Sequence, residues 1–159
     1  MKKNALIKKI VAELLGELEL YSRAADAARA EATDEQSKAE SKYDTRGLEA
    51  SYLARGQSRR ITETERAIKE IEALPLRQFG PQDPIDLGAL VELEARDEQS
   101  YYFLAPCAGG TEVTHDKKEI LVITPQSPLG EQLMGRKQGD RLKIEIAGTR
   151  DEYRVVSVK

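Results

Sequence analysis

The sequence contains few of the side chains that usually fill a large core or build a reactive centre. It has no tryptophan, and aromatic residues make up 5% of its 159 residues. A single compact core of this length normally uses more aromatic bulk, so we expect an elongated arrangement. The single cysteine, Cys107, excludes a disulfide pair and a four-cysteine zinc site, and the single histidine, His115, excludes a histidine-rich metal centre. We expect both to be structural or surface residues, and we expect no cofactor of the protein's own.

Long apolar runs are also missing. Lys8, Lys9 and Glu13 interrupt the apolar positions near the N-terminus, which fits neither a signal peptide nor a membrane span, so we expect a cytoplasmic protein with no membrane contact. Charged residues make up 33% of the chain, and the net charge is -3. This balance argues against a general nucleic-acid binder held by phosphate contacts, and it favours a protein partner.

Proline is absent between Ala5 and Leu74, a stretch rich in helix-forming residues. Three prolines then fall within residues 75–84, and such a segment cannot continue a helix. We therefore predict three parts: a helical region over residues 1–74, a linker over 75–84 and a second domain over 85–159.

The helical region carries two runs of mostly apolar residues, spaced alternately by four and three positions. The first run is Ile7, Val11, Leu14, Leu18, Tyr21, Ala25, Ala28 and Ala32, and the second is Ala50, Ala54, Gln57, Ile61, Thr64, Ile68 and Ile71. Paired head to tail, the runs keep one register, which places the reversal of the chain near Ala39. The pattern predicts an antiparallel coiled-coil hairpin with its tip near residues 36–46.

The second domain contains short β-type runs, of which Ala89–Ala95 alternates apolar and polar residues as a half-buried strand does. We expect strands at Ala89–Ala95, Tyr101–Leu104, Glu119–Ile123, Arg141–Ile146 and Tyr153–Val158. Ser127 has the position of a helix cap, Pro128 that of the first helical residue and Gly135 that of the stop. The predicted fold class is therefore α+β, with an N-terminal antiparallel helical hairpin followed by a β-rich domain with one short helix.

Residues 123–140 resemble part of a known domain. Their Ser-Pro-Leu, short helix and Gly-Asp sequence is similar to a stretch of the FKBP-like C-terminal domain of the Gre transcript cleavage factors, and the order of parts agrees over essentially the whole chain. The resemblance implies a monomeric factor that binds bacterial RNA polymerase and meets RNA only at the transcript 3′ end inside that complex. It also implies that the C-terminal domain, near Ser127–Lys137, grips the polymerase while the coiled-coil tip enters the secondary channel.

The predicted tip is acidic, with six carboxylates from Glu31 to Glu49. Carboxylates can complete the shell of a weakly held magnesium ion, which can then activate water. In the Gre family this is how the factor helps the polymerase to cut backtracked RNA, with an Asp and a Glu three residues apart. This sequence lacks that pair, and its nearest substitutes are Glu40 and Asp44, four residues apart. We expect Asp44 and Glu40 to be the catalytic tip residues, sharing the polymerase Mg²⁺, in an accessory factor that is not itself an enzyme.

Other functions fit parts of the sequence. Residues 44–47, Asp-Thr-Arg-Gly, resemble the tip of DksA, a secondary-channel factor that regulates initiation without cleaving RNA, so a DksA-like, non-cleaving regulator is the alternative. A peptidyl-prolyl isomerase would need an aromatic-lined pocket, for which the chain offers few aromatic residues. A coiled-coil adaptor for another protein is a third possibility.

Overall fold

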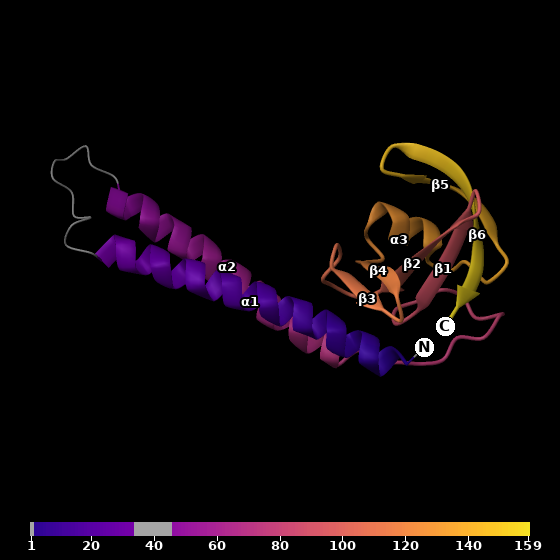
Figure 1. The fold of residues 1–159 in the computed structure, drawn as a ribbon, viewed down its shortest axis with the longest axis horizontal. Helices are drawn as coiled ribbons and strands as arrows, with labels where there is room; N and C mark the ends of the chain where they lie inside the picture. Colours follow the sequence, from indigo (N-terminus) through magenta and orange to yellow (C-terminus); the bar gives the residue numbers. More distant parts are fainter. Residues whose placement is uncertain (1, 34–45) are drawn as a thin grey trace. The chain divides into compact units, whose positions relative to one another are not determined.

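The computed structural model describes residues 2–33 and 46–159. Within these ranges the elements are α1 (Lys3–Thr33), α2 (Arg46–Glu72), β1 (Leu90–Ala95), β2 (Glu98–Leu104), β3 (Glu112–His115), β4 (Lys118–Ile123), α3 (Pro128–Leu133), β5 (Arg141–Ile146) and β6 (Thr149–Val158) (Figure 1). The α+β class is confirmed. By its contacts the chain forms two compact units, one of residues 12–69 and one of residues 1–11 together with 70–159. The division at residues 75–84 stays a prediction about the domains.

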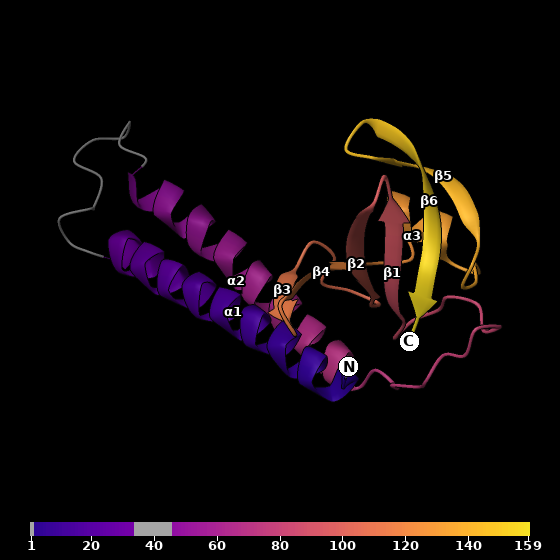
Figure 2. The ribbon, with the colours of Figure 1, turned by 45° about the vertical axis from the view of Figure 1, so that its right-hand side comes forward.

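The helices α1 and α2 lie side by side and run in opposite directions in both views (Figures 1 and 2), as the two apolar runs predict. Every member of those runs whose side chain is described is buried or half-buried. The buried members are Leu14, Ala25, Ala28, Ala50, Ala54, Thr64 and Ile71, and the half-buried ones are Ile7, Val11, Leu18, Tyr21, Gln57, Ile61 and Ile68. The seam of the pair is therefore the one expected from the spacing.

Two polar contacts join the helices beside this seam. The Arg29 guanidinium donates a hydrogen bond to the Ser58 hydroxyl over 2.8 Å, and the Arg60 guanidinium lies 5.6 Å from the centre of the Tyr21 ring. The flanking seam residues Ala25, Ala28 and Ala54 are small, which lets the helix backbones approach closely. Alanine buries little apolar surface. The end of α1 and the start of α2 are therefore held together more weakly than they would be by a seam of leucines.

The six strands form one sheet in the order β3-β4-β2-β1-β6-β5. Neighbouring strands are antiparallel except β2 and β4, which are parallel, with Tyr101 opposite Ile120. Three hairpins connect consecutive strands through two-residue turns in which both residues have positive φ, for example 51° at Asp116 and 61° at Lys117. Such turns match the right-handed twist of the strands they join.

Strand β3 is absent from the sequence-based prediction. It has only four residues, and its turn is Asp116-Lys117 rather than the Asn-Gly or Asp-Gly pair that marks a hairpin in a sequence. Its burial nevertheless alternates, with Val113 and His115 buried and their neighbours exposed. The strand is specified by pairing with β4 rather than by its own composition.

One face of the sheet packs against α3. The core there includes Val91, Leu93, Leu104, Leu133, Ile144 and Val155, all fully buried. Phe79 and Ile85 belong to the same core, although Phe79 lies in the segment predicted as a linker. Residues 75–84 do contain no helix or strand, yet the Phe79 side chain ties them to the second domain.

The opposite face of the sheet is also closed. Phe103, Ile120 and Val122 are buried but do not belong to the core beneath α3. The Lys9 ammonium donates a hydrogen bond to the Thr114 carbonyl over 2.8 Å, so the start of α1 lies beside β3. Leu6, Ile10 and Ile71, which belong to the same compact unit, are fully buried as well.

Candidate functional site

The predicted tip residues Glu40 and Asp44 lie in residues 34–45, outside the described part of the chain. The helix ends on either side of that segment, Thr33 and Arg46, lie at the same end of the helical pair in both views (Figures 1 and 2). The predicted tip near residues 36–46 stays a prediction. The role of Glu40 and Asp44 stays a prediction.

A rigid turn precedes α3. The Ser127 hydroxyl accepts a hydrogen bond from the Gly130 backbone N–H over 3.1 Å and donates one to the Thr124 carbonyl over 2.7 Å. Pro128 occupies the start of the helix, where its fixed φ and missing N–H cost nothing. Ser127 is thus confirmed as the cap of α3, and both of its side-chain hydrogen bonds stabilise the turn.

Close backbone packing adds to the rigidity of this turn. At Gly130 a Cβ atom would lie 1.8 Å from the Thr124 carbonyl oxygen, so only glycine fits there. Leu129 and Leu133 anchor α3 in the core. Away from the core, Gln126, Pro128 and Glu131 are exposed. The backbone that carries them is fixed by the contacts described above.

The residues after α3 extend this exposed surface. Residues 135–139 are all exposed, but their backbone is fixed: the Gly135 N–H donates to Ile85 O over 2.9 Å, and Arg136 O accepts from Ile85 N over 2.7 Å. The Lys137 N–H donates to the Asp140 carboxylate over 2.9 Å. We call the exposed residues Gln126, Pro128, Glu131, Arg136, Lys137 and Gln138 the α3 surface. Because its backbone is fixed by these hydrogen bonds, little further ordering of the chain is needed if a partner binds there.

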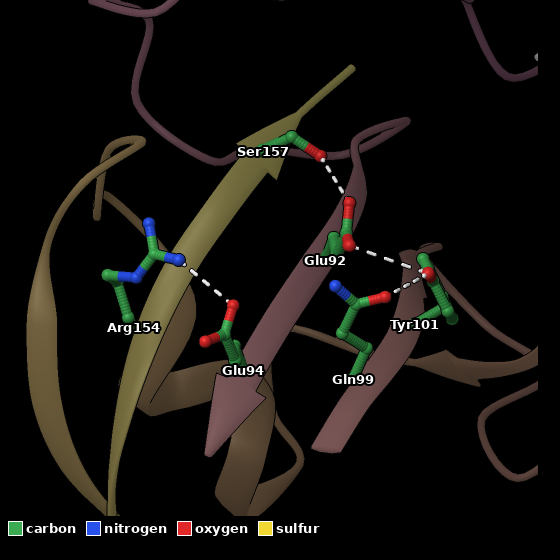
Figure 3. Close-up of polar contacts among 6 residues, drawn as sticks. All are labelled: Glu92, Glu94, Gln99, Tyr101, Arg154 and Ser157. Carbon is green, nitrogen blue, oxygen red and sulfur yellow. Dashed lines mark hydrogen bonds and ion pairs between the residues drawn. The ribbon is translucent and has the colours of Figure 1, made fainter. Parts of the chain in front are cut away.

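A second polar group of residues lies on β6, β1 and β2 (Figure 3). Glu92 accepts hydrogen bonds from the Ser157 hydroxyl at 3.2 Å and the Tyr101 hydroxyl at 3.4 Å, and Glu94 pairs with Arg154 at 2.9 Å. These are cross-strand pairs, each typically contributing about 0.2–1 kcal/mol to the sheet. Both carboxylates are held by neighbours, so we interpret this group as structural.

A hollow of about 760 Å³ lies beside β2, β3 and β4. Its aromatic lining is Tyr101 and Tyr102, and charged residues such as Glu112, Lys117 and Glu119 make up much of the remainder. A prolyl isomerase pocket requires an apolar, aromatic lining. This hollow does not provide one, which weighs against the isomerase alternative.

Cys107 and His115 lie apart from the surfaces above. Burial, and to a lesser extent the hydrogen bond to Glu70 and the negative charge of that residue, raises the pKa of the Cys107 thiol to about 11, which disfavours the reactive thiolate form. His115 is buried on β3, with its Nε2 atom 3.6 Å from the Asp116 carboxylate.

In the part of the chain that the structure describes, no three His, Cys, Asp or Glu side chains are grouped to hold a metal ion. Among the same residues, none of the helices has the length and apolar character of a membrane span.

Comparison with known proteins relates the second domain to a known family. The sequence model of the family "Transcription elongation factor, GreA/GreB, C-term" matches residues 80–159. The transcription inhibitor protein Gfh1 of Thermus thermophilus is 30% identical over 120 residues, covering 73% of this chain and 72% of that protein. The transcription elongation factor GreA of Lachnoclostridium phytofermentans is 29% identical over 103 residues, which span 63% of this chain and 59% of that protein. Among solved structures, that of the transcription factor Gfh1 aligns over 95% of this chain and 94% of its own, with 27% identity and a TM-score of 0.41.

Proposed function

Since the chain belongs to the GreA/GreB family of transcription elongation factors, we propose that it regulates transcription by binding bacterial RNA polymerase. The observation that carries the proposal is the family match over residues 80–159, which include the α3 surface. In this role the protein is an accessory factor, and any RNA cleavage is carried out by the polymerase. It acts as a monomer and has no cofactor of its own.

The helical pair is proposed to enter the polymerase secondary channel. At 1.5 Å per residue, the 31 residues of α1 extend over roughly 46 Å. Two helices whose seam includes the small residues Ala25, Ala28 and Ala54 form a slender probe, which suits a narrow channel. The predicted tip, residues 36–46, is the part proposed to enter first.

The α3 surface is proposed to hold the polymerase outside the channel. We predict that Arg136→Glu lowers the affinity for RNA polymerase by about tenfold or more, because a charge reversal within an interface adds repulsion and leaves a charge without its partner. The backbone contacts of Arg136 with Ile85 remain, so the fold is retained. The matched control is Lys143→Glu, a reversal at an exposed position of β5, which is expected to bind normally in the same fluorescence titration; equal affinities for the two variants would contradict this assignment of the surface.

At the tip, Asp44 and Glu40 are proposed to assist the catalytic Mg²⁺ of the polymerase in cleaving backtracked RNA. The combined change Asp44→Asn and Glu40→Gln is expected to slow transcript cleavage in stalled complexes by at least about tenfold, because it removes the oxygen charge that helps to hold a hard cation. Polymerase affinity is expected to stay the same. Glu31→Gln, at an exposed position near the end of α1, is the control and is expected to cleave normally.

The alternative is a non-cleaving regulator that acts through the same channel. A specific observation favours keeping it: the chain lacks the family's Asp and Glu three residues apart, and one relative is described as a transcription inhibitor protein. The two functions separate in one assay on stalled complexes with the unaltered protein. Shortened RNA supports the first, whereas bound factor, reduced RNA synthesis and no shortened RNA would support the second.

A further inference from the structure

The first residues of α1 and the segment after α2 enclose a small basic pocket. Its volume is about 260 Å³, and its lining residues are Lys2, Lys3, Asn4, Leu76, Arg77 and Gln78. Three of these six are cationic and none is acidic. All six belong to the compact unit of residues 1–11 and 70–159, so the pocket lies within one unit of the fold.

Lys3 is the unusual member of this group, because only 6% of it is exposed. Its ammonium donates a hydrogen bond to the Arg77 carbonyl over 2.7 Å and lies 4.6 Å from the centre of the Phe79 ring. The Arg77 guanidinium lies 4.2 Å from the same ring centre. Both cations thus lie against one aromatic ring, and the ring itself is fixed by its buried position in the core.

No negative charge in the pocket lining offsets these two cations. An ammonium group has three N–H donors, and the hydrogen bond to the Arg77 carbonyl uses one. Burial, followed by repulsion from Arg77, lowers the pKa of Lys3 from 10.5 to about 8. Keeping positive charge at this pocket is therefore unfavourable for the free energy of the folded protein. A bound anion would offset that unfavourable energy.

We propose that this pocket binds one oxyanion group, a phosphate or a carboxylate, between the Lys3 ammonium and the Arg77 guanidinium. The planar guanidinium matches two oxygens of such a group, and the ammonium supplies further donors. The absence of an acidic residue from the first turn of α1 leaves the positive end of that helix near the same place. The pocket is a small-ligand or single-side-chain site, because its volume holds one such group.

The test uses the full chain and inorganic phosphate, followed by nuclear magnetic resonance of backbone amides at constant ionic strength. Saturable shifts are expected at residues 3, 4 and 78, in the millimolar range. Arg77→Gln is expected to weaken binding by about tenfold, because it removes a charge-assisted pair of hydrogen bonds. Lys143→Gln, which removes a cation outside the pocket, is the matched control and is expected to leave the affinity unchanged; the dispersed spectrum of each variant verifies its fold.

A pH series gives a second readout that a change of folding alone would not give. Sulfate is used here, since its charge stays constant over the range. Because the Lys3 pKa in the folded protein is about 8, affinity is expected to be highest below pH 8 and to fall as pH rises through that value. Conversely, bound sulfate raises the pKa of Lys3, which carbon shifts of its side chain report.

Acetate distinguishes the sources of the anion. Binding of phosphate with little binding of acetate indicates a phosphorylated small molecule, and equal binding indicates a carboxylate side chain of a partner; both support an oxyanion site. Shifts that rise linearly with phosphate and are the same in the unaltered protein and Arg77→Gln would overturn the proposal. Neither outcome bears on polymerase binding, which is measured separately.

Discussion

Replacing Gly130 with alanine is expected to destabilise the protein by at least about 3 kcal/mol, the upper end of the usual cost of overpacking. The added Cβ atom would lie 1.8 Å from the Thr124 carbonyl oxygen and 2.9 Å from the Ser127 hydroxyl. The Thr124 carbonyl cannot move away freely, because it accepts hydrogen bonds from both the backbone N–H and the hydroxyl of Ser127. Urea denaturation followed by circular dichroism measures the change in the free energy of unfolding.

Gly56→Ala is the matched control. Gly56 lies inside α2, and an added Cβ atom there meets nothing within 4 Å. The same chemical change should then stabilise the protein by roughly 0.5–1 kcal/mol, since alanine favours a helix. A Gly130→Ala protein that unfolds at the same urea concentration as the unaltered chain would show that the turn before α3 is loosely packed.

The same substitution also tests the α3 surface. Relieving the clash requires residues 124–127, which include Gln126, to shift relative to α3, while the chemical nature of the exposed side chains stays the same. We therefore expect Gly130→Ala to bind polymerase more weakly even at temperatures where it remains folded. This would separate the shape of the surface from its composition.

The helical pair and the α3 cap could be predicted from the sequence because both depend on local rules. An apolar stripe repeats with the period of a helix whatever lies elsewhere in the chain, and Ser127-Pro128 marks a helix start within a few residues. The predicted strands also overlap β1, β2, β4, β5 and β6, although β2 and β6 begin earlier than predicted, because each contains a short apolar or alternating run.

The features missed by sequence reasoning depend on distant parts of the chain. Ile7 fits the helical stripe, but the structure buries Leu6 and Ile10 completely and leaves Ile7 half-buried, because the start of α1 also meets the sheet. Strand β3 forms because β4 is beside it. Similarly, nothing local distinguishes Lys3 from Lys2, and only the approach of Phe79 and Arg77, more than seventy residues later, makes it a buried cation.

Substituting Phe103 with alanine is expected to cost about 3–5 kcal/mol of the free energy of unfolding, the usual range for a large buried aromatic residue. Phe103 is fully buried on the face of the sheet opposite α3, where the cavity left behind would be closed poorly by the rigid strands on either side. Leu20→Ala, at a position that is 65% exposed, should change stability by less than about 0.5 kcal/mol. Thermal and urea denaturation measure both.

Phe103 also tests which part of the chain packs on the sheet face opposite α3. If the start of α1 closes it, Phe103 and Leu6 share one cavity, and the double change Phe103→Ala with Leu6→Ala should depart from additivity by about 0.5–3 kcal/mol. Leu133 is fully buried on the α3 face. The double change Phe103→Ala with Leu133→Ala should therefore depart much less from additivity. If the losses of unfolding free energy for Phe103→Ala and Leu6→Ala are additive, the start of α1 does not complete the core of the second domain. The sheet is then stable without it.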